Sequence, residues 1–136
     1  LKYFYLTDSD TRTIYRFDYN QETGDITNQQ NHIVIPEAEG VPDGMTVDSE
    51  GYIWSARWDG KHLYRYTPEG TEVLRIEFPA LKVSCLAFGG SDYSDIYATT
   101  AGGNDRSKEG DGAGAIFHLQ AGVKGIPEFT SKIGNW

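Results

Sequence analysis

Three stretches of this chain resemble one another at intervals of about 40 to 50 residues. In each stretch, a short run with apolar residues at alternate positions is followed by a polar turn and a second such run. The first runs are residues 3–7 (YFYLT), 53–57 (IWSAR) and 96–100 (IYATT), and the second runs are residues 14–18 (IYRFD), 63–67 (LYRYT) and 116–120 (IFHLQ). A period of two predicts β-strands, so each stretch is expected to form a β-hairpin.

Further apolar segments extend each hairpin into a larger unit. An opening strand is expected before the second and third hairpins, and a third strand after every hairpin; these are residues 45–47 and 84–88, and residues 26–35, 72–78 and 126–133. Four strands per unit at this period are typical of the blades of a β-propeller. The sequence therefore predicts an all-β chain that forms one partial propeller domain. It would contain about three four-stranded blades, near residues 1–40, 41–80 and 81–136, the first without its opening strand.

Charge and composition exclude several functions. The chain has 12 basic and 20 acidic residues and a net charge of −8, which disfavours nucleic-acid binding and polybasic membrane docking. No apolar run approaches the roughly 18 residues of a membrane span. Cys85 is the single cysteine, so an intramolecular disulfide and a cysteine-based zinc site are excluded. A cytoplasmic location is expected, and a periplasmic or secreted location is the alternative, because a disulfide-free protein of those compartments would have the same composition. Because the sequence starts at Leu1 without Met, we expect a piece of a longer polypeptide.

Two motifs in the middle of the chain resemble a known family. Residues 41–54 (VPDGMTVDSEGYIW) and residues 79–90, which end in FGG, are similar to blocks of the regucalcin/gluconolactonase/luciferin-regenerating-enzyme family. The strands at residues 96–101 and 14–19 support the resemblance. It implies a six-bladed propeller of which this chain is the C-terminal half. It also implies hydrolysis of a sugar lactone with a divalent metal, calcium or zinc, at one mouth of the central channel.

The resemblance assigns Asp43, in the Pro42–Gly44 motif, as a metal ligand and catalytic carboxylate. The competing interpretation is an ordinary turn, because Pro-Asp-Gly is a common β-turn sequence. Asp43 is the one family ligand with a counterpart in this chain, and a hard cation takes several oxygen ligands. The alternative hypothesis is therefore a non-catalytic fragment, or a half-propeller that serves as a binding or assembly module.

Other residues near the predicted site have two interpretations each. Ser84 is a candidate for orienting water or a carboxylate, against plain packing on the backbone. Trp58 is a candidate wall of a sugar pocket, against packing at a strand end. Cys85 is expected to be a small buried hydrophobic residue, and Trp54 is expected to lie in the core.

The remaining expectations concern a loop, the histidines and assembly. Residues 102–114 are expected to form a mobile, solvated loop. Its acidic residues could suggest a calcium-binding loop, but they lack the spacing of an EF-hand. The three histidines have no spacing typical of a zinc site. Three blades leave two open end faces, so we expect a homodimer that closes the ring, with residues 126–133 supplying the missing strand to the partner.

Overall fold

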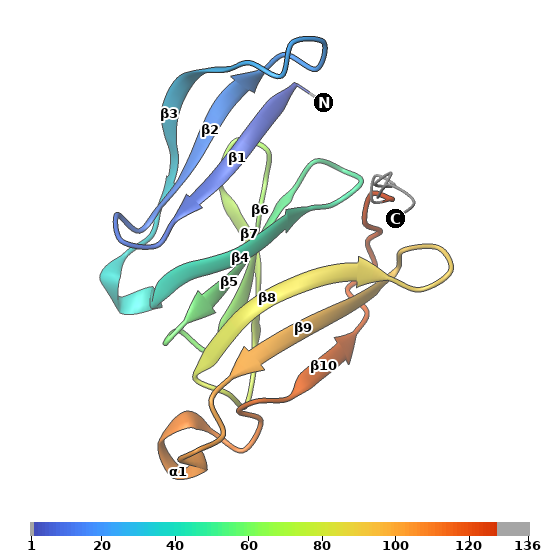
Figure 1. The fold of residues 1–136 in the computed structure, drawn as a ribbon. Helices are drawn as coiled ribbons and strands as arrows, with labels where there is room; N and C mark the ends of the chain where they lie inside the picture. Colours follow the sequence, from blue (N-terminus) through green and yellow to red (C-terminus); the bar gives the residue numbers. More distant parts are fainter. Residues whose placement is uncertain (1, 128–136) are drawn as a thin grey trace, which may run out of the picture.

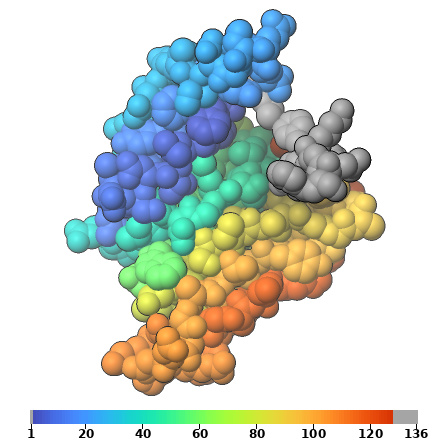
Figure 2. All heavy atoms as spheres, viewed as in Figure 1, coloured from blue at the N-terminus to red at the C-terminus, as the bar shows by residue number. Residues whose placement is uncertain are grey.

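The computed structural model describes residues 2–127 of the 136-residue chain. Within this range ten β-strands form three antiparallel sheets, which follow one another in chain order in Figure 1. This arrangement confirms the predicted all-β fold. Figure 2 shows the sheets as adjoining bands, from blue through teal and green to orange, with the first and third sheets at opposite ends. No helix among the described residues is long and apolar enough to cross a membrane.

The first sheet has three strands in the order β1-β2-β3. They are β1 (Tyr3–Asp8), β2 (Thr13–Tyr19) and β3 (Ile26–Val34). Strand β1 forms an edge of this sheet, as predicted for a unit without its opening strand. A single turn of 3-10 helix, η1 (Glu37–Glu39), leads to the next sheet.

The second sheet has four strands in the order β4-β5-β6-β7 and matches the predicted four-stranded unit. They are β4 (Val41–Val47), β5 (Ile53–Trp58), β6 (His62–Tyr66) and β7 (Glu72–Glu77). Strand β4 starts at Val41, earlier than the predicted start at Met45. The Pro-Asp-Gly motif therefore lies inside a strand, and its interpretation as a turn is wrong.

The third sheet has the order β10-β9-β8. Its strands are β8 (Lys82–Gly89), β9 (Asp95–Ala101) and β10 (Ile116–Leu119). The fourth strand predicted over residues 126–133 falls mostly outside the described residues. The long β9–β10 connection, predicted as a mobile loop, contains a one-turn helix, α1 (Arg106–Glu109).

The pairing register corrects the alignment of the first repeat. Thr7 pairs with Ile14, and Ala56 pairs with Leu63 in the second sheet. Ile14 lies on the face of the first sheet that packs on the second, and Leu63 lies on the face of the second sheet that packs on the third. The two residues are therefore equivalent, and so are their partners Thr7 and Ala56. By the same alternation, Tyr5 corresponds to Trp54. The sequence alignment placed Phe4 opposite Trp54, one residue away. A slip of one residue moves every side chain of a strand to the other face, so the structure reverses the predicted faces of β1.

Two hydrophobic cores fill the spaces between the three sheets. The core between the first and second sheets is built from Ile14, Ile33, Ile35, Ile53, Tyr64 and Tyr66. The core between the second and third sheets is built from Trp54, Ala56, Leu63, Phe78, Val83, Leu86, Ile96 and Ala98. Trp54 is fully buried there, as predicted. Each sheet thus holds its neighbour by apolar burial, the main favourable contribution to folding.

A buried arginine lies in the first of these interfaces. The Arg57 side chain is fully buried, and its guanidinium lies 4.6 Å from the centre of the Tyr64 ring. Its Nη2 donates a hydrogen bond of 2.6 Å to the Tyr66 hydroxyl. Burial raises the pKa of Tyr66 to about 12, so this phenol stays neutral and accepts the bond across the physiological range. Stacking on two tyrosines compensates part of the cost of burying the cation.

A buried carboxylate organises the turn between β4 and β5. Asp48 is fully buried, and its Oδ1 accepts hydrogen bonds from the backbone N–H groups of Glu50 (3.0 Å) and Tyr52 (2.9 Å). Its Oδ2 accepts from Trp54 Nε1 at 2.9 Å and from Arg65 Nε at 2.8 Å. Both oxygens are satisfied, so one aspartate fixes the hairpin turn, a core tryptophan and the next strand together.

Candidate functional site

Asp43 lies in a β-bulge of strand β4. Pro42 pairs with Arg57 and Met45 pairs with Ser55, so Asp43 and Gly44 together stand opposite the single residue Ala56. A bulge re-aims the side chains of the extra residue, and bulges are frequent beside functional sites. The Pro42 carbonyl oxygen accepts a 2.9 Å hydrogen bond from Ser9 Oγ, which ties the bulge to the turn after β1.

Gly44 lets the bulge pack against the third sheet. A side chain at this position would place its Cβ 2.8 Å from Cys85 Cα and 2.6 Å from Cys85 Sγ. Such distances are far inside van der Waals contact, so only glycine permits β4 and β8 to approach this closely. The glycine of the motif is therefore required by packing.

Asp43 on β4 and Trp58 on the neighbouring strand β5 line one cavity. This cavity has a volume of about 300 Å³ and is lined by Ser9, Val41, Pro42, Asp43 and Trp58. Partial burial raises the pKa of the Asp43 carboxyl above its ordinary value, and a hydrogen bond from the Gly44 backbone opposes the shift. The cavity therefore combines a flat indole with a carboxylate of increased basicity, two groups suited to a polar ring.

Trp58 also contacts a cation. Lys82 Nζ lies 5.2 Å from the centre of the Trp58 ring and 3.3 Å from Glu109 Oε1. Glu109 Oε2 accepts hydrogen bonds from the backbone N–H groups of Gly103 (2.8 Å) and Asp105 (3.3 Å). The wall of the cavity is thus linked through Lys82 to the β9–β10 connection.

These contacts give a testable role to Glu109. The backbone N–H groups of Gly103 and Asp105, with Lys82, hold the pKa of Glu109 below its ordinary value. We expect Glu109→Gln to increase hydrogen exchange at these two amides several-fold, measured by NMR, while Asp111→Asn in the same connection leaves it unchanged. In the wild type the protection is present at neutral pH and is lost as the pH falls through the lowered pKa of Glu109. Equal protection in both variants would contradict this role.

The other predicted site residues lie close by but outside the lining of the Asp43 cavity. Ser84 Oγ is 3.1 Å from the Thr99 carbonyl oxygen and 2.9 Å from Thr99 Oγ1, so its hydroxyl is engaged with β9. Its role in orienting water or a carboxylate stays a prediction. Cys85 is exposed, so the expected buried position is wrong: along β8 it alternates with Leu86, which takes the core position.

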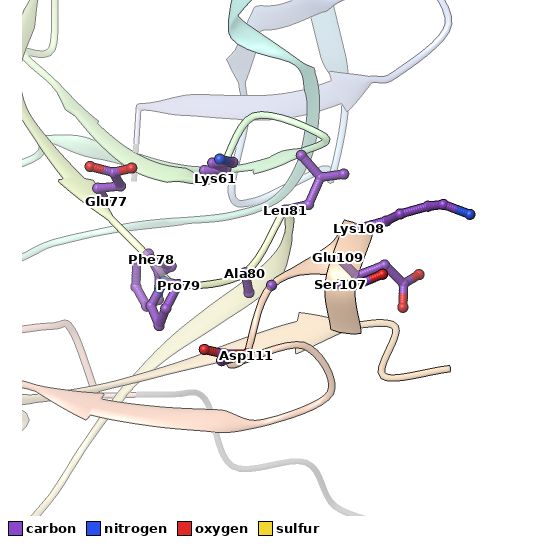
Figure 3. Close-up of a pocket in the computed structure, with 11 residues that line it drawn as sticks. Lys61, Glu77, Phe78, Pro79, Ala80, Leu81, Ser107, Lys108, Glu109 and Asp111 are labelled. Carbon is purple, nitrogen blue, oxygen red and sulfur yellow. The ribbon is translucent and has the colours of Figure 1, made fainter. Parts of the chain in front are cut away.

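A second cavity, of about 270 Å³, lies between the β7–β8 connection and helix α1. Figure 3 shows Ser107, Lys108 and Glu109 on one side of it and Pro79, Ala80 and Leu81 on the other. Backbone hydrogen bonds join the two connections beside it, from Leu81 N to Glu109 O (2.7 Å) and from Gly112 N to Pro79 O (2.7 Å). It is a packing space between two connections, and it does not include Asp43 or Trp58.

A divalent metal needs more ligands than the described residues bring together. Among residues 2–127, no three His, Cys, Asp or Glu side chains lie together in a way that could hold a metal ion. Asp43 contributes one carboxylate to its cavity, whereas calcium takes six to eight oxygen ligands and structural zinc four. The described part of the chain therefore does not fit a complete metal site by itself.

Sequence reasoning missed four residues of this region. Ser9 and Lys82 approach Pro42 and Trp58 from other sheets, and Glu109 reaches Lys82 from a connection 27 residues away. Asp48 lies within the motif at residues 41–54, but the motif alone assigns it no contact. Its position six residues before Trp54 was the one available signal, since a carboxylate at a hairpin turn can reach a neighbouring indole.

Comparisons with known proteins agree on one group. A family model described as the SMP-30/Gluconolactonase/LRE-like region matches residues 2–102. Pentonolactonase XacC of Haloferax volcanii is 44% identical over 137 residues, which cover 96% of this chain and 47% of that protein. Regucalcin of Gallus gallus is 38% identical over 133 residues, covering 94% and 44%.

A solved structure gives the same result for the fold. The crystal structure of a calcium-binding protein, regucalcin, from Agrobacterium tumefaciens matches with a TM-score of 0.84 at 30% identity. The match covers 92% of this chain and 44% of that one. The chain therefore spans slightly less than half the length of these relatives, and its three sheets correspond to part of a propeller-type structure.

Proposed function

The chain belongs to the SMP-30/gluconolactonase/LRE-like family, and from this membership we propose that it is part of a sugar-lactone hydrolase whose reaction takes place at Asp43. The observation that carries the proposal is the shared cavity of Asp43 and Trp58. Lactonase names among the relatives support the substrate class. A cavity of about 300 Å³ is at the small end of the range for ligand pockets, which suits a small ligand such as a monosaccharide lactone.

The two side chains have distinct roles in this proposal. The indole of Trp58 packs against the apolar face of the sugar ring and orients it. The Asp43 carboxylate takes a proton from the attacking water, whose oxygen forms a bond to the lactone carbonyl carbon. The ring C–O bond then breaks, and the leaving ring oxygen takes the proton back from Asp43, which gives the open hydroxy acid and restores the carboxylate. A pKa raised toward neutrality increases the basicity of Asp43, which favours proton abstraction.

A divalent metal, calcium or zinc, would polarise the lactone carbonyl when bound, with Asp43 as one ligand. The missing ligands would come from outside the described residues, since Asp43 alone does not hold a hard cation tightly.

The second candidate is a non-catalytic binding or assembly module. The observation that favours it is that the cavity contains a single carboxylate, too few ligands for a metal site. The relatives are about twice as long as this chain, so the chain corresponds to only part of such a protein. The two hypotheses differ in one readout. A module of this kind binds a lactone or another protein chain without turnover.

The test is hydrolysis of glucono-δ-lactone by the 136-residue chain, followed with a pH indicator with and without added calcium or zinc. Asp43→Asn keeps the shape and removes the base, so we expect kcat/KM to fall by about 10²- to 10⁴-fold. Asp59→Asn is the matched control at the same end of the sheet. It is exposed, lies outside the cavity lining, and has a positive φ that asparagine tolerates.

The pH profile gives a second readout. Because the carboxylate form of Asp43 is required and partial burial raises its pKa, activity measured without added metal should decline with falling pH earlier than for an ordinary aspartate. Wild-type activity retained in Asp43→Asn would overturn the catalytic proposal. Lactone binding without turnover in the wild type would favour the second candidate.

A further inference from the structure

Strand β4, which carries Asp43, is an edge strand of the second sheet. The backbone groups on its outer side therefore have no partner strand within that sheet. Gly40, directly before the strand, and Pro42, inside it, are both buried. A buried carbonyl group without a hydrogen bond is costly, so the segment that leads into Asp43 needs donors from another part of the chain.

Two side chains of the β1–β2 turn supply these donors. Ser9 Oγ donates a hydrogen bond of 2.9 Å to the Pro42 carbonyl oxygen, and Arg12 Nη1 donates to the Gly40 carbonyl oxygen. The two bonds lie on either side of Val41. The turn of the first sheet thus holds the backbone just before Asp43 at two points, across the boundary between two sheets.

The β1–β2 turn is itself held in place. The backbone N–H of Thr11 donates to Asp8 Oδ1 at 3.1 Å, and the backbone N–H of Arg12 donates to the Ser9 carbonyl oxygen at 3.3 Å. The Arg12 carbonyl oxygen accepts a 2.9 Å bond from the backbone N–H of Ile35, a residue buried in the core between the first and second sheets. Ser9 and Arg12 are therefore fixed relative to that core.

The segment that they hold also packs against the end of the strand that carries Trp58. Gly40 has a φ of 78°, and a Cβ at this position would lie 2.5 Å from the Trp58 carbonyl oxygen and 2.6 Å from the Gly60 nitrogen. Ser9 itself lines the cavity together with Asp43 and Trp58. The position of residues 40–43 therefore determines where the carboxylate lies relative to the indole.

We propose that Ser9 and Arg12 are positioning residues, which hold Asp43 in its place at the cavity by bonding the two carbonyl groups before it. This inference rests on the proposed function, in which Asp43 is the base, and adds that the first sheet controls the geometry of a reaction at the second. A base must lie within hydrogen-bond reach of the water that it activates. A displacement of about 1 Å can lower a rate by about 10²-fold.

The kinetic test is lactone hydrolysis by Ser9→Ala, which loses the bond to Pro42. We expect kcat to fall by about 10- to 100-fold while KM changes by less than about 3-fold. Ser9→Thr keeps the hydroxyl group and should restore most of kcat. Thr11→Val is the matched control, because it removes a hydroxyl group of the same turn whose partner is the Tyr15 hydroxyl. A raised KM with unchanged kcat in Ser9→Ala would assign Ser9 to substrate binding and overturn the positioning role.

A double variant tests whether Ser9 acts through Asp43. The base is absent in Asp43→Asn, so adding Ser9→Ala to that variant should cause no further loss of kcat. A full additional loss would contradict the proposal. Arg12→Ala removes the bond to Gly40 and should lower kcat in the same way as Ser9→Ala. Circular dichroism checks that each variant keeps its β-structure.

Hydrogen exchange measured by NMR gives a readout that needs no turnover. The Gly44 backbone N–H donates to the Asp43 carboxyl, so its exchange reports on the bulge. We expect this exchange to become several-fold faster in Ser9→Ala and Arg12→Ala and to stay unchanged in Thr11→Val. Unchanged exchange in both of the first two variants would overturn the positioning role, whatever the activity. Faster exchange together with full activity of Asp43→Asn would overturn the proposed function instead, so the two failures are distinguishable.

Discussion

Replacement of Asp48 by alanine should lower the free energy of unfolding by about 3–5 kcal/mol, the cost of removing one partner from a buried ion pair. The loss is large because four donors lose their acceptor together: the backbone N–H groups of Glu50 and Tyr52, Trp54 Nε1 and Arg65 Nε. Asp48 is fully buried, so water does not replace the carboxylate without reorganising the core. Urea denaturation monitored by tryptophan fluorescence measures the change.

Two further variants separate the contributions at this position. Asp48→Asn keeps an oxygen for the two backbone donors and loses the charge that faces Arg65, so an intermediate loss is expected. Glu50→Ala removes the other carboxylate that contacts Arg65, at 2.6 Å, but this glutamate side chain is 57% exposed. An exposed pair contributes about 0–1 kcal/mol, so Glu50→Ala should have little effect. Equal losses in Asp48→Ala and Glu50→Ala would contradict the role of Asp48.

Gly44→Ala should destabilise the protein by about 1–3 kcal/mol, as expected for overpacking of a close contact. The added methyl would lie 2.8 Å from Cys85 Cα, so β4 and β8 must separate. Because Asp43 is the neighbouring residue in the bulge, the same shift should reduce lactone hydrolysis if Asp43 is the base. Chemical denaturation and the hydrolysis assay measure the two effects on one sample.

Cys85→Ala is the control for this contact. It removes an exposed thiol and leaves the backbone of β8 in place, so its effect on stability should stay within about 0.5 kcal/mol. The double variant Gly44→Ala/Cys85→Ala should remain destabilised, because the clash with Cys85 Cα persists. Full recovery in the double variant would show that the sulfur, and not the backbone approach, limits the space.

Most of the fold was predictable because its signals are local. Each hairpin is specified by alternation within a few residues, and the predicted strands at residues 53–57 and 63–67 match β5 and β6 to within one residue at each end. Strand β4 was predicted to start too late because the Pro-Asp-Gly motif is typical of a turn when considered alone. Its conformation as a bulge depends on the register with Arg57 and Ser55, which the motif itself does not contain.

The candidate site was predictable only in part, for the same reason. Asp43 was singled out from its motif and Trp58 from its place at a strand end, and both line one cavity. The approach of Lys82 to Trp58 and the bond from Ser9 to Pro42 join residues of different sheets, so no local pattern reports them. The alignment of β1 was wrong by one residue because Tyr3, Phe4 and Tyr5 are all aromatic, and alternation is ambiguous in such a run.

The carboxylate of Asp48 also bears on the order in which the chain folds. Its most distant partner, Arg65, is only 17 residues along the chain, so these hydrogen bonds close a short loop at small entropic cost. The strands β5 and β6 that carry Trp54 and Arg65 are joined by a short turn, which keeps their contacts local. The middle sheet is therefore the segment that we expect to fold first. The first and third sheets would then condense on its two faces, each as a hairpin that finds a preformed surface.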